Sequence, residues 1–198
     1  GNDITDSDLS TYGAYAGFKF TPDIELKGIY YWQDQGRTRP THVANEDSAN
    51  AWKAILQVNQ NALKFTSLWL EYGQIDNNFE KGPAGLPGSR AGTTYAINGA
   101  EILWNRPSNS LDTTTVIAVF ARQQWSDKWR TYERFIQADF DTASLDDATN
   151  WTFGVAYRLS PAIEFDLSYD NIDYGDNNPA GFRTGDDHQI RFRTFVTF

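Results

Sequence analysis

The sequence contains no cysteine and no methionine, and it has only two histidines, His42 and His188. Without cysteine there can be neither a disulfide framework nor a thiolate metal site. Two histidines leave little room for histidine-based chemistry. The missing initiator methionine indicates a mature form or a fragment, so nothing upstream can be read from this sequence.

A long apolar run and an excess of positive charge are also missing. The mean hydropathy is −0.57, and no stretch approaches the roughly 18 apolar residues of a transmembrane helix. The net charge of −9 argues against nucleic acid as a partner, because nucleic-acid-binding domains present a basic face. Aromatic residues nevertheless make up 15% of the chain. A transmembrane β-barrel fits this composition, because only every second residue of its strands faces lipid.

Apolar and polar residues alternate through much of the chain. Between Trp151 and Leu159 every odd-numbered residue is aromatic or aliphatic, and every even-numbered residue is small or polar. The same alternation runs through 11–20, 24–33, 52–59, 66–73, 163–170 and 189–198. Side chains of a strand point alternately to its two faces, so each segment is predicted to be a β-strand with one apolar and one polar side.

Soluble antiparallel sandwiches also alternate, but three details favour a membrane barrel. The segments run to about 10–12 residues, as tilted membrane strands do, whereas soluble strands average about 5–6. Their opposite faces carry charges at mid-strand. Their apolar faces often end in an aromatic residue, as interfacial girdles do: Trp32, Tyr72, Trp151, Tyr169 and Phe198. We therefore predict an all-β fold, a transmembrane antiparallel β-barrel of outer-membrane type over 1–198.

The expected connections alternate between short and long. Short ones lie at 21–23, 59–62, 126–127 and 160–162, and long ones at 36–50, 75–111, 141–150 and 175–187. Outer-membrane barrels have short periplasmic turns and long outer loops. Counted backwards from Phe198, short and long connections alternate only if 75–111 is a single outer loop. In that loop, Thr94–Trp104 would fold into the lumen.

This interpretation gives about nine strands, an odd number that is unusual for a complete bacterial barrel. We therefore expect the C-terminal portion of a larger barrel of about 16 strands. Missing N-terminal strands of the same protein would then separate the first strand of this chain from the last. If Thr94–Trp104 is a strand instead, a small ten-stranded barrel is the alternative.

Charged residues on the polar faces of the predicted strands are the candidate pore-lining residues. They are Lys53, Arg158, Glu164, Asp166, Arg191 and Arg193. In a barrel, acidic and basic ladders would lie side by side. Such ladders either bias ion passage or neutralise each other and simply pack the wall, and the sequence leaves both open. Asp170 is expected at the start of a long, solvated acidic loop.

No catalytic or metal site is predicted. Asp187 and His188 are adjacent, so in a strand they would point to opposite faces. No nucleophilic serine motif and no EF-hand spacing are present. We therefore expect a protein that is not an enzyme and needs no cofactor.

Two segments resemble known proteins. The segment 63–79, LKFTSLWLEYGQIDNNF, resembles the outer-membrane porins that carry an N-terminal S-layer homology domain, which occur in diderm relatives of Gram-positive bacteria. The segment 187–198, DHQIRFRTFVTF, is similar to the terminal strand of outer-membrane barrels in general. Its Phe192, Val196 and Phe198 resemble the signal read by the barrel-assembly machinery.

The first resemblance implies a trimeric general porin tethered to peptidoglycan through the S-layer homology domain. That domain is not in this sequence, so no tethering residue can be assigned. Together with the strand pattern, the resemblance predicts a porin in the outer membrane of a diderm bacterium, through which small hydrophilic solutes and ions diffuse. Its partners would be outer-membrane lipid, the barrel-assembly machinery and further copies in a homotrimer. The alternative functions are a secreted carbohydrate-binding β-sandwich and a small outer-membrane adhesin or enzyme.

Overall fold

The computed structural model describes residues 10–34, 48–76, 79 and 113–197. These residues form β1 (Ser10–Thr21), β2 (Ile24–Asp34), β3 (Ser48–Val58), α1 (Gln60–Leu63), β4 (Ser67–Asp76), β5 (Thr113–Gln124), β6 (Trp129–Asp139), β7 (Ala148–Ser160), β8 (Ile163–Asp173) and β9 (Asp186–Val196). The expected all-β class is confirmed, and the described residues form nine strands. Within the described part of the chain, no helix is long and apolar enough to cross a membrane.

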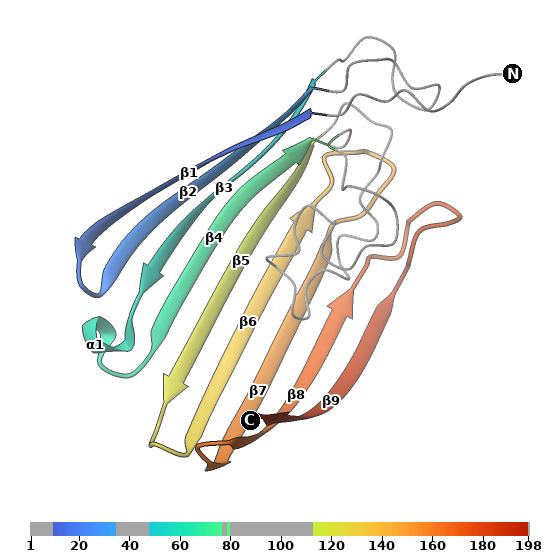
Figure 1. Cartoon of the computed structure of the whole chain (residues 1–198). Coiled ribbons are helices and arrows are strands. Elements are labelled where there is room, and N and C mark those ends of the chain that lie inside the picture. Colours follow the sequence, from blue (N-terminus) through green and yellow to red (C-terminus); the bar gives the residue numbers. More distant parts are fainter. Residues whose placement is uncertain (1–9, 35–47, 77–78, 80–112, 198) are drawn as a thin grey trace, which may run out of the picture.

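All of these strands belong to a single antiparallel sheet in which each strand pairs with the next, from β1 to β9. Figure 1 shows the sheet curved like a trough, with β1 and β9 at its two edges. A β-sandwich needs two sheets packed face to face, and the described strands form one sheet only. No backbone ladder joins β1 to β9 among the described strands, as we expected, and the alternative of a small closed barrel is not observed.

The short connections lie together at one end of the sheet (Figure 1). Neighbouring turns are joined there by backbone hydrogen bonds: the Asn59 N–H donates to the Asp23 carbonyl at 2.8 Å, and the Arg158 N–H donates to the Lys128 carbonyl at 2.8 Å. The connection 59–66 holds α1 and is longer than the turn we predicted. This sorting of connections is the one that outer-membrane barrels show.

Two of the long connections, 140–147 and 174–185, lie at the opposite end. The Asp146 carboxylate accepts hydrogen bonds from the backbone N–H groups of Asp176, at 3.0 Å, and Asn177, at 2.9 Å. The two connections are therefore packed against each other. The predicted excursion 75–111, with Thr94–Trp104 inside it, falls outside the described residues except at 75, 76 and 79.

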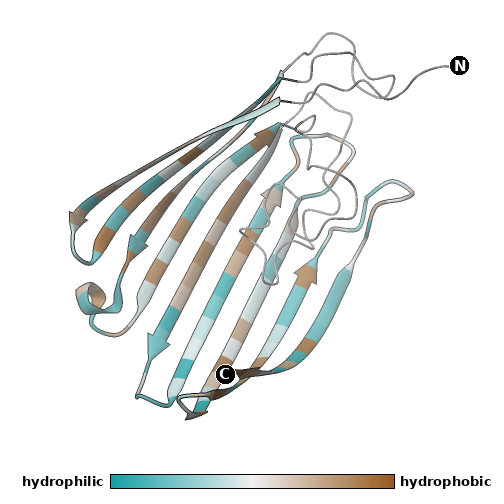
Figure 2. Cartoon of the chain, in the orientation of Figure 1, coloured by the Kyte–Doolittle hydropathy of each residue, from teal (hydrophilic) through white to brown (hydrophobic). Residues whose placement is uncertain are grey.

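The two faces of the sheet differ sharply in chemistry and burial. Every buried residue of the described strands lies on one face, the one that carries Glu71 and Arg158 and that was predicted to be polar wherever the alternation was recognised. The cross-strand row of Glu71, Ala118, Ile136 and Asn150 illustrates it. Figure 2 shows hydrophilic and hydrophobic bands alternating along many strands. Side chains converge on the concave side of a curved sheet, so we assign this polar face to the concave side.

The opposite, apolar face is exposed and rich in aromatic residues. Cross-strand aromatic pairs lie near both ends of the strands. Toward the long connections, the ring centroids of Tyr12 and Trp32 are 5.4 Å apart. Toward the short turns, those of Trp129 and Tyr157 are 4.6 Å apart. Aromatic rings at both edges of an apolar band are typical of the two membrane interfaces.

Four strand boundaries differ from the prediction. β3, β7 and β9 begin earlier than expected, at Ser48, Ala148 and Asp186, and β8 continues to Asp173. On the extensions of β3, β7 and β8 the outward side chains are polar and most of the buried inward ones are apolar, such as Ala49, Ala148 and Ile172, so the alternation is reversed there. The backbone ladder continues regardless, with Thr149 paired to Asp173 and Asp173 paired to Asp186. The hydropathy pattern therefore predicted the part of each strand with an apolar outer face, but not the full length of the strand.

Candidate functional site

The six charged residues singled out in the sequence all lie on the polar face. Lys53 is on β3, Arg158 on β7, Glu164 and Asp166 on β8, and Arg191 and Arg193 on β9. The structure brings those of β7, β8 and β9 into one charged cluster, because the register places Arg158 beside Glu164 and Asp166 beside Arg193. Lys53 lies apart from this cluster.

Near the short turns, Glu164 is shared by two arginines. The Arg130 Nη2 donates to Glu164 Oε1 at 2.5 Å, and the Arg158 Nη2 lies 3.9 Å from Glu164 Oε2. The side chains of Arg130 and Glu164 are largely buried, whereas that of Arg158 is 52% exposed. One carboxylate thus faces two guanidinium groups, and the more accessible of the two is Arg158.

In the next part of the cluster, Tyr132 reaches across a strand to Asp166. Its hydroxyl donates to Asp166 Oδ1 at 3.0 Å, and the same oxygen accepts from Arg193 Nη2 at 2.6 Å and Arg193 Nε at 3.1 Å. Tyr132 is on β6 and Asp166 on β8, so the ring must lie over β7. It lies over Gly154, where an added Cβ would overlap the Tyr132 ring at its Cζ.

Toward the long connections, Asp170 is buried, with only 1% of its side chain exposed. The Arg134 Nη2 lies 3.1 Å from Asp170 Oδ1, and the Thr152 hydroxyl donates to the same oxygen at 2.5 Å. The Arg191 Nη2 lies 4.0 Å from Asp170 Oδ2. The prediction that Asp170 begins a solvated loop is therefore wrong. The sequence 170–173 is polar, but it continues β8 as a paired strand.

Lys53 makes a separate ion pair across β3 and β4. Its Nζ lies 2.7 Å from Glu71 Oε1, and the Trp69 Nε1–H donates to Glu71 Oε2 at 3.0 Å. The Glu71 side chain is 2% exposed and that of Lys53 is 11% exposed. The pair is buried on the polar face, and β5 lies between it and the cluster of β6–β9.

Sequence reasoning missed the contribution of β6. Arg130, Tyr132 and Arg134 occupy alternate positions of that strand and all join the cluster. Their spacing of two residues was a usable signal, because side chains at i, i+2 and i+4 line one face of a strand. The role of Gly154 had no such signal, because it depends on which residue lies opposite it on β6.

Some side chains on the polar face are apolar. Next to the long connections, β5–β8 and the residues that follow them form a buried hydrophobic cluster of Val116, Ala118, Ile136, Ala138, Phe140, Ala148, Ile172 and Tyr174. None of these side chains is more than 3% exposed. Apart from Asp187 at the start of β9, whose side chain is 56% exposed, the accessible charges on this face of β5–β9 lie toward the middle of the strands and the short turns.

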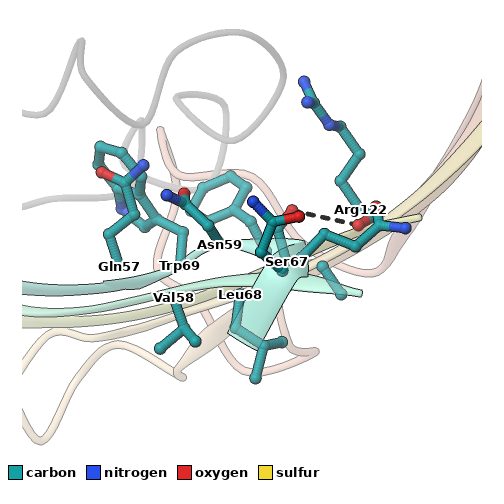
Figure 3. A pocket seen from close by; sticks show the side chains of 11 residues that line it. Gln57, Val58, Asn59, Ser67, Leu68, Trp69 and Arg122 are labelled. Atoms are coloured by element: carbon teal, nitrogen blue, oxygen red, sulfur yellow. Dashed lines mark hydrogen bonds between the residues drawn. The ribbon is translucent and has the colours of Figure 1, made fainter. Parts of the chain in front are cut away.

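A hollow of about 430 Å³ lies near α1, between the ends of β3, β4 and β5. Figure 3 shows Gln57, Trp69 and Arg122 rising from one side of the sheet, and Val58 and Leu68 pointing to the other. The dashed line marks the hydrogen bond from the Ser67 hydroxyl to the Arg122 carbonyl, 3.1 Å long. The Arg122 side chain thus belongs to the polar face and is exposed there.

The predicted assembly signal lies on the apolar face. Phe192 and Val196 are both exposed there on β9, and the Phe192 ring lies 6.1 Å from that of Phe165 on β8. Phe198 falls outside the described residues. The exposed apolar row is compatible with such a signal, whose recognition stays a prediction.

Asp187 and His188 lie on opposite faces, as expected, since Asp187 pairs with Ile172 and His188 with Asn171. The His188 Nδ1 lies 3.0 Å from the Tyr169 hydroxyl on the apolar face. Across the ranges that the structure describes, no three histidine or carboxylate side chains are grouped so that they could hold a metal ion.

No protein-family model and no curated protein matches the sequence. Among solved structures, the chain is similar to that of a "CymD monoaromatic hydrocarbon channel", with 12% sequence identity and a TM-score of 0.53. The match covers 93% of this chain and 50% of that chain, so this chain spans about half the length of that structure. The likeness shows the fold, which is a transmembrane antiparallel β-barrel of outer-membrane type. The open sheet of this chain is compatible with a part of the wall of such a barrel.

Proposed function

We propose that the chain forms the wall of an outer-membrane pore through which small hydrophilic solutes and ions diffuse passively. The observation that carries this proposal is the division of the sheet into two faces. Charged side chains such as Arg158 and Arg191 lie on the concave face, and large apolar side chains such as Leu167 and Phe192 are exposed on the other. In a barrel, the first face borders a polar lumen and the second borders lipid.

The charged side chains in the lumen would attract or repel solutes electrostatically, without reacting with them. The proposed pore-lining residues are Lys53, Arg158, Glu164, Asp166, Arg191 and Arg193, and we add Arg130 and Arg134 because they lie on the same face. Fixed charges along a pore favour ions of opposite sign. We propose no reaction and no cofactor for this protein.

Apolar side chains on the polar face offer little support for a hydrocarbon route. Val116, Ile136 and Ile172 lie there, but each is at most 3% exposed. A path for hydrocarbons needs continuous accessible apolar surface. The exposed rings on this face, Tyr15, Tyr31 and Phe195, lie near its two edges on β1, β2 and β9, with the exposed Arg122 and Arg158 between them. We therefore do not propose a monoaromatic hydrocarbon, for which the CymD channel is named, as a solute of this chain.

The finer assignment is to the porins that carry an S-layer homology domain, in the outer membrane of a diderm bacterium. Its support is the segment 63–79, most of which forms β4 and the end of its preceding turn. As partners we propose membrane lipid on the apolar face, the barrel-assembly machinery at β9 and further copies in a homotrimer. The trimer rests on the family resemblance alone.

The absence of cysteine allows a direct test of the two faces. Ile190 and Arg191 are neighbours on β9 that point to opposite sides of the sheet. Each is replaced by cysteine in the full-length protein, which is then reconstituted in a planar bilayer and exposed to a water-soluble, charged thiol reagent. We expect ohmic channels whose current drops on modification of Arg191→Cys and does not change with Ile190→Cys.

The variant Ile190→Cys is the matched control for Arg191→Cys. Both cysteines lie on β9, at about the same depth in the membrane, and both carry the same thiol. If the full-length protein conducts no ions at all, the porin function is wrong. Equal modification of the two cysteines with equal effects on current would also contradict the proposal, because then the apolar face would not border lipid.

A further inference from the structure

Cations outnumber carboxylates on the polar face of β5–β9, although the whole chain has a net charge of −9. The cations are Arg122, Arg130, Arg134, Arg158, Arg191 and Arg193, which we call the basic strip. The carboxylates on the same face of these strands are Glu164, Asp166, Asp170 and Asp187. The acidic residues that determine the net charge of the chain therefore lie elsewhere in the sequence.

The three carboxylates of β8 are paired within the strip, Asp166 with Arg193 and the other two with two arginines each. Glu164 faces Arg130 and Arg158, at 2.5 and 3.9 Å. Asp170 faces Arg134 and Arg191, at 3.1 and 4.0 Å. A carboxylate offers about four acceptor sites, whereas each guanidinium carries five N–H donors. One carboxylate between two arginines therefore leaves positive charge on the strip.

The most accessible arginines lie toward the short turns. The side chain of Arg158 is 52% exposed, and it lies two residues before the end of β7. Arg122 is also exposed, two residues before the end of β5, and it borders the hollow beside α1. A solute that approaches the polar face from the end with the short turns meets these two guanidinium groups before the buried network of Arg134 and Asp170.

We propose that the basic strip makes the pore select small anions, with carboxylate-bearing and phosphate-bearing solutes as the favoured class. This inference rests on the pore function proposed above. A guanidinium presents a planar fork of donors that matches carboxylate and phosphate oxygens. Its charge also does not depend on pH in the physiological range. The strip thus combines a general attraction for anions with a geometry suited to oxyanions.

The test is the reversal potential of the full-length protein in a planar bilayer under a gradient of potassium chloride. We expect a sign that reports chloride preference. In the double variant Arg122→Gln/Arg158→Gln, which leaves the buried network intact, the chloride-to-potassium permeability ratio should fall by about twofold to fivefold. A unit charge several ångströms from the path of an ion changes its energy by a sizeable fraction of RT even in water.

A matched control removes two positive charges outside the strip. Lys64 and Lys128 are exposed on the connections 59–66 and 125–128, and Lys64→Gln/Lys128→Gln should move the reversal potential much less. The preference of the unaltered protein should also weaken as the salt concentration rises, because exposed charges are screened. Gradients of potassium acetate and potassium phosphate should give the same sign as chloride.

The failures of the two proposals can be distinguished. Absence of any conductance contradicts the pore function itself. Conductance with potassium preference, or an equal shift in the two double variants, overturns anion selection by the basic strip. Preference for chloride that disappears with acetate and phosphate overturns the proposed class of solute.

Discussion

The two halves of the sheet carry different cations on the polar face. On β1–β4 they are lysines: Lys19, Lys27 and Lys53. On β5–β9 they are all arginines. Lys27 pairs with Glu25 of its own strand at 3.2 Å, and Lys53 pairs with Glu71 of the adjacent strand at 2.7 Å. The lysine half thus contains local ion pairs, whereas the arginine half contains a network.

The difference follows from the shapes of the two side chains. The lysine ammonium is a compact point charge, whereas the arginine guanidinium is a planar fork with five donors. Arg193 on β9 therefore contacts Asp166 on β8 through two nitrogens and also lies 3.4 Å from the Tyr132 hydroxyl of β6. Arg134 on β6 contacts Thr152 on β7 and Asp170 on β8. Arg193 and Arg134 thus each link three strands through hydrogen bonds and ion pairs. Lys27 also reaches three strands, but its third contact is the ring of Trp69 on β4, 5.7 Å from its Nζ, beside a hydrogen bond to Gln57 on β3.

Breaking the network at its most buried carboxylate should have the largest effect. Asp170→Ala removes the carboxylate beside Arg134, whose side chain is only 7% exposed. Removing one partner of a buried ion pair costs about 3–5 kcal/mol, because the remaining charge stays buried. We expect a loss of this size in the free energy of unfolding, measured by denaturant titration of the reconstituted protein.

The matched variant in the lysine half is Glu25→Ala. Glu25 pairs with Lys27, and both side chains are more than one-fifth exposed. Such pairs contribute about 0–1 kcal/mol, so the variant should unfold almost like the unaltered protein. The lysine half also contains a buried pair, Lys53 with Glu71. Equal losses for Asp170→Ala and Glu25→Ala would therefore show that the burial of an ion pair does not determine its contribution to stability.

The second prediction concerns the two faces. Leu167 of β8 is 46% exposed on the apolar face, and Phe195 of β9 is 47% exposed on the polar face. A lipid-facing arginine near the bilayer midplane costs about 2–4 kcal/mol in a barrel. Leu167→Arg should therefore impair assembly, measured as the yield of folded protein by its heat-modifiable mobility on gels. Phe195→Arg should be tolerated, because the register places it beside Glu164.

The variant Asp166→Arg is unsuitable as the tolerated counterpart, although the alternation alone suggests it. The Asp166 side chain is only 2% exposed and accepts hydrogen bonds from Tyr132 and Arg193. An arginine there would place two guanidinium groups together without their carboxylate. If Leu167→Arg and Phe195→Arg assemble equally well, the assignment of the faces is wrong.

The sequence predicted the faces but not the partners. Side chains alternate with a period of two, so one correct residue in a strand assigns all the others, and Lys53, Arg158 and Arg193 were placed on the correct face. Which groups meet depends on the register between strands and on the reach of each side chain. Asp170 was missed because the polar run at 170–173 has the composition of a loop, whereas its backbone stays in the ladder.

The third prediction tests the crossing of Tyr132 over β7. An added Cβ at Gly154 would overlap the Tyr132 ring, whereas one at Gly28, on the apolar face, meets nothing within 4 Å. Gly154→Ala should displace the ring and break its hydrogen bond to Asp166. Overpacking of this kind costs about 1–3 kcal/mol. Gly28→Ala should leave the free energy of unfolding close to that of the unaltered protein.

The same pair of variants can be compared by spectroscopy. Tyr132 is one of ten tyrosines, so selective labelling with a resonance assigned through Tyr132→Phe is needed to follow its hydroxyl. A Gly154→Ala protein that keeps both its stability and the Tyr132 resonance would refute the crossing. A loss of stability that Gly28→Ala shares would instead indicate a general intolerance of alanine in these strands.

The smallest expected effect comes from exchanging the two cations. Arg193→Lys keeps the charge beside Asp166 but replaces a group that donates from Nε at 3.1 Å and from Nη2 at 2.6 Å by a single ammonium. It also removes the contact with Tyr132. Losing about one net hydrogen bond should cost about 0.5–1.5 kcal/mol. The reverse exchange, Lys27→Arg, keeps the partly exposed pair with Glu25 and should change stability by no more than about 0.5 kcal/mol. Denaturant titration of the two variants beside the unaltered protein measures this difference. A loss confined to Arg193→Lys means that the arginine half depends on the shape of its cation, and no difference between the variants means that charge alone holds both halves.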